Sequence, residues 1–221
     1  MQKFDTPAPI SAVLEIPAGR VRLIAAQRAD TTVEVLPADP AKGRDVKAAG
    51  RTSVAYTDGV LRITAPAPDS TLFGPSGSVE VTVQLPADSR VEGRAEGAEL
   101  RGVGRLGDIS FEGAYRHIKI DEAAGVRLTA IDGDIEVGRL GGPAEISTTR
   151  GDIRIMEARR GTVVLRTQTG DIAVAVATGV SATLDATAGH GRVSHALQND
   201  GTTALEIRAT TAKGDITARS I

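Results

Sequence analysis

The chain reads Ser147-Thr148-Thr149-Arg150-Gly151-Asp152-Ile153, and 19 residues later it reads Arg166-Thr167-Gln168-Thr169-Gly170-Asp171-Ile172. The Gly-Asp-Ile triplet also occurs at residues 107–109, 133–135 and 214–216, and Gly191-Arg192-Val193 is a degenerate copy. Short repeats of roughly this length are typical of a solenoid, in which each repeat packs only against its neighbours. This repeat therefore predicts the fold class.

Positions before the triplet repeat as well. A large apolar residue lies seven positions before the Ile of its repeat, and a small residue lies five positions before it: Leu128, Ile146 and Leu165, then Ala130, Thr148 and Thr167. Because side chains alternate along a strand, these positions share one inward face. The outward positions carry charge at Arg127, Glu136, Glu145, Arg154 and Arg166. Each repeat thus predicts two short strands and two corners, one of them formed by Gly-Asp.

Two later repeats fit with an altered spacing. Leu184 with Val193, and Ile207 with Ile216, are nine residues apart rather than seven, which predicts insertions of two residues at a corner. In the 26-residue gap between Ile109 and Ile135, the segment 115–120 is expected to supply the strand of a coil that lacks Gly-Asp.

The first 90 residues read as short strands. Thr57-Asp58-Gly59 predicts a tight turn between strands at 52–56 and 60–63, because Asp-Gly tolerates the positive φ angles of such turns. Residues 39–50 are expected to form a loop with at most one turn, and residues 65–77 a loop rich in Pro, Gly and Ser. We predict an all-β protein: an antiparallel β-hairpin region at 1–90 that caps a parallel β-solenoid of about five coils at 91–221, together one continuous structural unit.

Composition narrows the function classes. The 221 residues carry a formal net charge of -2, which gives no electrostatic reason to expect nucleic acid or anionic lipid as a partner. The absence of Cys excludes disulfides and thiolate metal sites. The five aromatic residues are scattered, so stacking platforms for sugars or bases are scarce. Without a signal peptide or a long apolar segment, the expected location is the cytoplasm, or outside the cell if a leader has been removed.

The repeated x-Thr-x-x-Gly-Asp-Ile unit resembles the bacterial β-strand-repeat domain of unknown function that is labelled "putative adhesin". The similarity extends over residues 10–221 and includes Glu15-Ile16-Pro17-Ala18-Gly19 followed by Val21. The resemblance implies an all-β, solenoid-like fold and, through the family's label, adhesion. It implies no catalytic residue.

The Asp residues of the triplets are the first candidate site. Stacked coils would align Asp134, Asp152 and Asp171, together with Asp108 and Asp215, and a column of carboxylates can bind a hard cation such as calcium. The alternative is that Asp side chains satisfy the N–H groups of the corners. Because Arg192 replaces Asp in one repeat, the sequence favours the structural role, and no metal ligand is assigned.

Other candidates are weaker. Glu136, Glu145, Arg154 and Arg166 could line one exposed sheet face, as in a carbohydrate-active β-helix enzyme. The Gly102–Gly107 segment matches a dinucleotide fingerprint, but a strand pattern rather than a helix follows it. His117, His190 and His195 show no metal-ligand spacing. We therefore assign no catalytic or cofactor-binding residue and no cofactor.

The sequence favours a non-enzymatic scaffold or protein-interaction module that can self-associate. Two alternatives stay open, a carbohydrate-active β-helix enzyme and a calcium-dependent surface adhesin. Because the chain stops on a strand-like segment at 216–221 with no cap after it, the C-terminal coil is expected to pair with a protein partner or a second copy. Whether a small molecule binds is left open.

Overall fold

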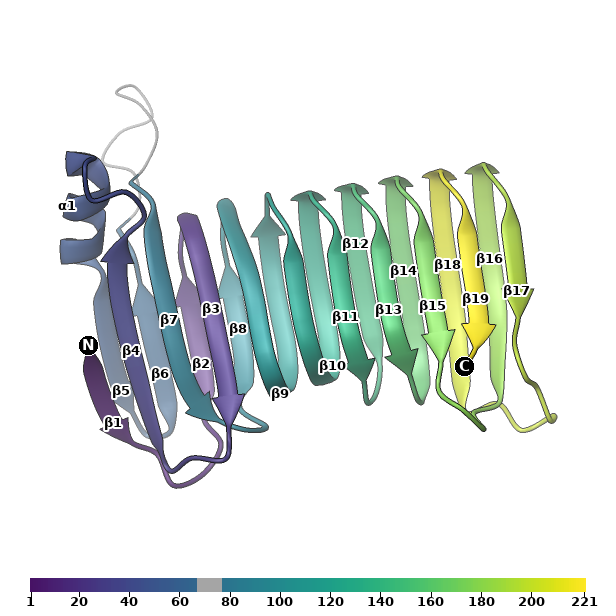
Figure 1. Cartoon of the computed structure of the whole chain (residues 1–221), viewed down its shortest axis with the longest axis horizontal. Coiled ribbons are helices and arrows are strands. Elements are labelled where there is room, and N and C mark those ends of the chain that lie inside the picture. Colours follow the sequence, from purple (N-terminus) through teal and green to yellow (C-terminus); the bar gives the residue numbers. More distant parts are fainter. Residues whose placement is uncertain (67–76) are drawn as a thin grey trace.

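The computed structural model describes residues 1–66 and 77–221, and it shows a flattened β-solenoid with two layers of strands (Figure 1). Within these residues, hydrogen-bonded strands follow one another along the whole length of the stack. The predicted all-β solenoid is confirmed. Most of the loop expected at 65–77 lies outside the described residues.

The strands of the first layer are, in spatial order, β1 (Gln2–Asp5), β4 (Asp30–Pro37), β7 (Val79–Pro86), β3 (Ala18–Ala26), the first half of β9 (Gly97–Ala114), the first half of β10 (Ile118–Asp132), β11 (Ile135–Leu140), β13 (Ile153–Ala158), β15 (Ile172–Val176), β19 (Ile216–Ser220) and β17 (Val193–Ala196). The long strands β9 and β10 bend at a corner and continue in the second layer.

The second layer contains, in spatial order, β5 (Ser53–Thr57), β6 (Val60–Thr64), β2 (Ser11–Glu15), β8 (Arg90–Arg94), the second halves of β9 and β10, β12 (Ala144–Arg150), β14 (Gly161–Thr169), β18 (Leu205–Lys213) and β16 (Ala182–His190). From β6 onward every pairing in this layer is parallel.

The inward faces of the two layers form a thin aliphatic core. Along one column, Ile120, Val137, Ile155, Val174 and Ala218 lie in register on neighbouring strands and are all buried. The predicted inward positions are confirmed, because Leu128, Ile146 and Leu165 form a buried column of their own. A narrow core of this kind is filled by Val, Ile, Leu and Ala, which explains why few aromatic residues suffice.

The spacing expected for the last two repeats is wrong. Leu165 aligns with Ala209 and with Ala186, which lie seven residues before Ile216 and Val193, so no residues are inserted at these corners. Ile207 instead aligns with Val163, one inward position earlier on the strand. The register is thus constant, and small Ala side chains occupy positions that hold Leu or Ile in earlier coils.

The segment 115–120 does supply the coil without Gly-Asp. Strand β10 begins at Ile118, which lies between Leu100 and Ile135 in neighbouring strands. The hairpin of β5 and β6 is also confirmed, with Asp58 and Gly59 at positive φ in its turn.

The N-terminal region is less purely antiparallel than predicted. Its antiparallel pairs are β1 with β4, β4 with β7 and β5 with β6, whereas β2 and β3 each lie between two parallel neighbours. The alternating polar and apolar side chains of β2 and β3 predicted hairpins, but these strands belong to the parallel solenoid. Such alternation does not distinguish parallel from antiparallel neighbours.

Residues 39–50 form more than a single turn. Helix α1 (Gly43–Arg51) packs beside β4 at the N-terminal end, where it buries Asp45 and Ala48. The Asp45 carboxylate accepts a hydrogen bond of 3.0 Å from the Ser78 N–H, a residue 33 positions away. Tertiary contacts of this kind stabilise a helix whose local sequence is weakly helical.

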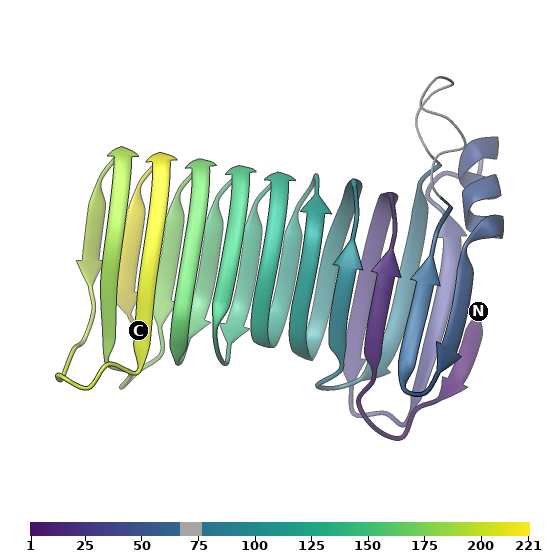
Figure 2. The same cartoon turned by 180° about the vertical axis from the view of Figure 1, so that it is seen from behind.

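The order of strands in space differs from their order in the chain at both ends. At the C-terminal end, β18 and β19 lie between the coil of β14 and β15 and the coil of β16 and β17. Figures 1 and 2 show this, since the yellow strands lie one coil inside the green end. At the other end, β2 and β3 lie between β6 and β7 on one side and β8 and β9 on the other.

Candidate functional site

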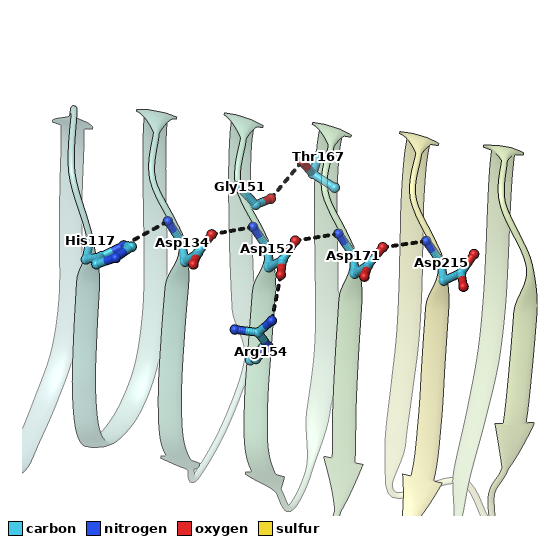
Figure 3. Close-up of polar contacts among 8 residues, drawn as sticks. All are labelled: His117, Asp134, Gly151, Asp152, Arg154, Thr167, Asp171 and Asp215. Atoms are coloured by element: carbon cyan, nitrogen blue, oxygen red, sulfur yellow. Dashed lines mark hydrogen bonds and ion pairs between the residues drawn. The ribbon is translucent and has the colours of Figure 1, made fainter.

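The Asp column is present, and its carboxylates hold the coils together. The Oδ1 atom of Asp134 accepts a hydrogen bond of 2.9 Å from the Asp152 N–H, and the pattern continues from Asp152 to Asp171 and from Asp171 to Asp215 at 2.8 Å each (Figure 3). The last carboxylate, Asp215, accepts from the Arg192 N–H at 2.8 Å. Each Asp thus satisfies a backbone donor of the next coil, which is the structural role that the sequence favours.

His117 begins this column in place of an Asp. Its Nδ1 accepts from the Asp134 N–H at 3.2 Å, so the imidazole supplies the same acceptor as a carboxylate (Figure 3). Asp108 does not belong to the column, contrary to expectation. It lies beside Gly125 at the opposite corner, where the chain passes from the first layer to the second, and its carboxylate is 3.5 Å from Arg90.

Gly and Thr complete the corner. Gly151 has a φ of 134°, and a Cβ atom there would lie 2.2 Å from the Gly133 carbonyl oxygen, so no larger residue fits. The buried Thr167 hydroxyl donates to the Gly151 carbonyl at 3.1 Å, and Thr211 donates to Gly170 at 3.0 Å. Thr167 and Thr211 therefore anchor the Gly of a neighbouring coil, whereas Thr148 donates to the Arg150 carbonyl of its own corner. Among residues 1–66 and 77–221, no cluster of three His, Asp or Glu side chains could hold a metal ion.

The four residues proposed for an enzymatic face do not converge. Glu136 and Arg154 lie on β11 and β13 in the first layer, whereas Glu145 and Arg166 lie on β12 and β14 in the second. Glu136 forms an ion pair with Lys119 (2.7 Å) and Arg154 with Asp152 (2.6 Å), whereas Glu145 and Arg166 pair with each other at 3.8 Å. The expected shared face is therefore wrong, because the inward columns place these residues on opposite sides of the solenoid.

The dinucleotide-like Gly102–Gly107 segment lies within β9, as the strand pattern predicted, and no helix follows it. His190 and His195 lie on β16 and β17, the coil at the C-terminal end of the solenoid. They are exposed and far along the stack from His117.

This end coil leaves part of the core uncovered, and we call β16 and β17 the open end. Val193 lies in register with the buried Ile216, yet 44% of its surface is exposed. The positions of Leu184, Ala186 and Ala188 correspond to residues that are fully buried one coil further in. The C-terminal coil itself is interior, so the expectation that it forms the unpaired end is wrong.

The opposite end is closed. Strands β1 and β5 are its edges, and they bring the rings of Phe4 and Tyr56 to 5.5 Å between centroids, packed against the core. Two of the five aromatic residues thus cover this end, together with α1 beside β4. Among the described residues, larger side chains therefore cover the N-terminal end than the open end.

The open end was not predicted from the sequence. The sequence feature that indicates it is the long interval of 23 residues between Val193 and Ile216, which contains the polar run Gln198-Asn199-Asp200-Gly201. This length permits the chain to pass the coil of β16 and β17 and to place β18 and β19 between that coil and the coil of β14 and β15. The interval was instead assigned to a corner insertion.

Two hollows lie on the surface of the described residues. One, of about 560 Å³, is lined by residues of β2, β8 and β9, including Glu15, Glu92, Glu112 and Arg94, and Arg94 forms a 3.0 Å ion pair with Glu112. The other, of about 710 Å³, lies at the corner after the first layer, among Arg105, Arg139, Arg159 and the acidic residues Asp121 and Glu122. No aromatic side chain lines either hollow.

In the described part of the chain, no helix combines the length and apolar character that a membrane crossing requires.

Comparison with known proteins agrees with the resemblance seen in the repeats. A family model described as Toastrack DUF4097 matches residues 13–220. A search of curated proteins found no match.

Two solved structures match this chain over nearly their whole length. The chain shares 11% identity with a "putative cell adhesion protein" from Clostridium sporogenes ATCC 15579, over 100% of this chain and 98% of that one, with a TM-score of 0.43. It shares 12% identity with a "putative adhesin" from Bacteroides fragilis NCTC 9343, over 100% of this chain and 95% of that one, with a TM-score of 0.37. Both TM-scores are below 0.5, so neither similarity bears on what this chain does.

Proposed function

The chain belongs to the Toastrack DUF4097 family, and on that premise we propose that it is a non-enzymatic protein-interaction module, a rigid solenoid that docks another polypeptide at its open end. The observation that carries this proposal is the difference between the two ends. The rings of Phe4 and Tyr56 pack together over one end, whereas the other end carries the smaller Leu184 and Ala186 and the 44% exposed Val193.

An uncovered strand edge binds other strands. A polypeptide in extended conformation adds to such an edge through main-chain hydrogen bonds, while pockets for alternate side chains supply specificity. The open end offers the free main-chain edge, because β16 is paired on one side by β18 and has no second neighbour among the described strands. The inward-facing side chains beside this edge would be covered by the added strand.

The two sheet faces are less suited to docking. Their outward positions carry charges of both signs that are paired across neighbouring strands, as in Arg127 with Glu145 (3.3 Å) and Arg150 with Asp132 (2.7 Å). Mixed, paired charge of this kind is typical of a surface in contact with solvent.

Site-specific photo-crosslinking tests the proposal. A photoreactive residue in place of Thr187, on the rim of the open end, should capture a polypeptide when the protein is expressed in its native cell. The matched control replaces Thr129, which has the same side chain and lies on the outward face of the same layer in the middle of the solenoid. Equal adduct yields at both positions, or none at Thr187, would refute docking at the open end.

A carbohydrate-active enzyme is the second candidate, favoured by one observation. The 560 Å³ hollow is lined by Glu15, Glu92 and Glu112 beside Arg94, and glycoside hydrolysis uses a pair of carboxyl groups. Incubation with a panel of polysaccharides tests this reading. Product release that disappears in Glu92→Gln and Glu112→Gln would support the enzyme and displace the interaction module.

A further inference from the structure

We propose that the partner at the open end is a second copy of this chain, bound through β16 across a twofold axis at Ala186. This inference rests on the proposed function, and it specifies which polypeptide occupies the edge. The first observation that supports it is the length of β16 along which backbone N–H and C=O groups have no partner on the outer edge of the strand. The Ala182 N–H donates to the Gln198 carbonyl at 2.9 Å, so it is not free. The His190 carbonyl turns toward the inner coil, where it accepts from the Gly214 N–H at 2.9 Å, so the free edge ends before this residue. The free stretch therefore runs from 183 to 189, and its midpoint is Ala186.

The direction of the backbone groups gives the second support. The Leu205 N–H donates to the Ser181 carbonyl, and successive residues of a strand point to opposite sides, so Thr183, Asp185 and Thr187 direct their groups toward β18. The groups of Leu184, Ala186 and Ala188 therefore point to the free edge. An antiparallel copy centred on Ala186 pairs Ala186 with itself and Leu184 with Ala188, so that every one of these donors and acceptors finds a partner.

Side chains are complementary in the same register. On the inward face, the large Leu184 meets the small Ala188 of the other copy, and the two cores become continuous. On the outward face, Asp185 lies opposite Thr187, so no two like charges are directly opposed along the paired strands. The alternative of head-to-tail stacking would place β16 against the end closed by Phe4 and Tyr56, and repetition of that contact would build open filaments.

The size of the contact is sufficient for a weak dimer. A nine-residue strand and two layers of strands give a cross-section of about 30 by 20 Å, from the usual rise per residue and sheet spacing. Two copies would then bury about 1,200 Å² in total, which is the lower limit of specific interfaces. We therefore expect a reversible dimer in the micromolar range.

Engineered cysteines test the register directly, because the chain contains no Cys of its own. Asp185 and Thr187 are exposed and face outward, so Asp185→Cys and Thr187→Cys should leave the fold intact. Residues directly opposed in a non-hydrogen-bonded antiparallel pair are close enough for a disulfide, whereas diagonal neighbours are not. An equimolar mixture of the two variants should form a disulfide-linked heterodimer, and each variant alone should form little. A mixture that crosslinks no better than the single variants would overturn the proposed register.

Sedimentation of the full chain tests association itself. Wild-type protein should show a monomer–dimer equilibrium, and Ala186→Lys should weaken it by at least about tenfold, because an inward-pointing charge at an edge opposes pairing. Thr129→Lys, remote from the open end, should leave it unchanged. A wild-type chain that stays monomeric at 100 µM or so, well above typical micromolar affinities, would overturn the dimer. If Thr187 then still captured a different polypeptide in the photo-crosslinking experiment, the interaction module would stand and self-association alone would fall.

Discussion

Single residues decide how closely the coils of this solenoid approach one another. Gly93 is buried on β8, and a Cβ atom at this position would lie 2.5 Å from the Phe111 ring on the adjacent β9. Phe111 is the largest fully buried side chain among the described residues, and it occupies the volume that Gly93 leaves empty. The pair is therefore complementary in shape, and neither residue can change size independently.

Gly93→Ala should accordingly destabilise the protein by about 1–3 kcal/mol, the usual cost of overpacking a core. Gly97→Ala is the matched control, because its Cβ would meet only the Pro17 carbonyl at 3.9 Å. Adding Phe111→Leu to Gly93→Ala should cost less than the sum of the two single changes. Urea denaturation measures all four variants, and strict additivity would mean that the contact is unimportant.

The Asp column permits a test that separates its structural role from cation binding. Asp152→Ala removes the acceptor of the Asp171 N–H and should lower the free energy of unfolding by about 1–2 kcal/mol. Asp152→Asn retains an acceptor oxygen and should cost much less, although it removes the charge. Chelator should leave the melting temperature of the wild-type chain unchanged. If Asn were as harmful as Ala and chelator lowered the melting temperature, the column would bind a cation.

At the scale of single strands, β1 is held in place by the Asp30 carboxylate, which forms ion pairs with a Lys and an Arg side chain. The Asp30 carboxylate is 2.9 Å from the Arg28 Nε and 3.2 Å from the Lys3 Nζ, and Lys3 belongs to β1. The hydrogen bonds from Arg28 and then Lys3 lower the pKa of Asp30 from 3.8 to about 2. The folded state thus binds this proton less readily than the unfolded state.

The sign of the pH dependence follows from this difference. A carboxyl group with a lowered folded-state pKa contributes stability above pH 3.8, and that contribution is lost as the pH falls toward 2. Asp30→Asn should therefore expose the β1 amides to faster hydrogen exchange at pH 6, and the difference from wild type should vanish near pH 2. Exchange measured by NMR at both pH values checks this, with the β12 amides as an internal control. A difference that is the same at both pH values would exclude Asp30 as its cause.

Strands and corners could be predicted from the sequence where a short residue pattern is enough to specify them. Gly-Asp at a corner and the inward Leu128, Ile146 and Leu165 are local signals, and the structure confirms them. Ala209 and Ala186 gave no such signal, because Ala is compatible with either face of a strand. Helix α1 was missed because contacts with distant residues, such as Asp45 with Ser78, stabilise it.

At the scale of the whole molecule, the order of the coils was not predictable. The inward columns recur from coil to coil, and Asp171 could accept from the backbone N–H of Arg192 as well as it accepts from that of Asp215, so the coil of β16 and β17 could follow β14 and β15 as well as the coil of β18 and β19 does. Local sequence cannot distinguish these arrangements. The consequence for function is large, since the order of the last two coils determines which residues form the open end.

We expect the identity of the end coil to affect solubility as well. The inward positions at the open end hold Leu184, Ala186, Ala188, Val193 and His195, a set of smaller total size than the Val163, Leu165, Thr167, Ile172 and Val174 of the coil that β18 and β19 cover. Edges that carry small or polar residues resist uncontrolled aggregation. The coil of β16 and β17 therefore exposes a less aggregation-prone surface than the coil of β14 and β15 would expose.

Truncation after Thr178 tests this reading. The shortened solenoid should keep its β-structure by circular dichroism, because each coil depends chiefly on its immediate neighbours. It should aggregate at protein concentrations where the full chain forms at most dimers, since the new end exposes Val163, Leu165, Ile172 and Val174. Lys in place of Val174 should restore solubility to the truncated chain. A truncated protein that is folded and monodisperse by light scattering without this change would show that the natural end coil does not protect the stack.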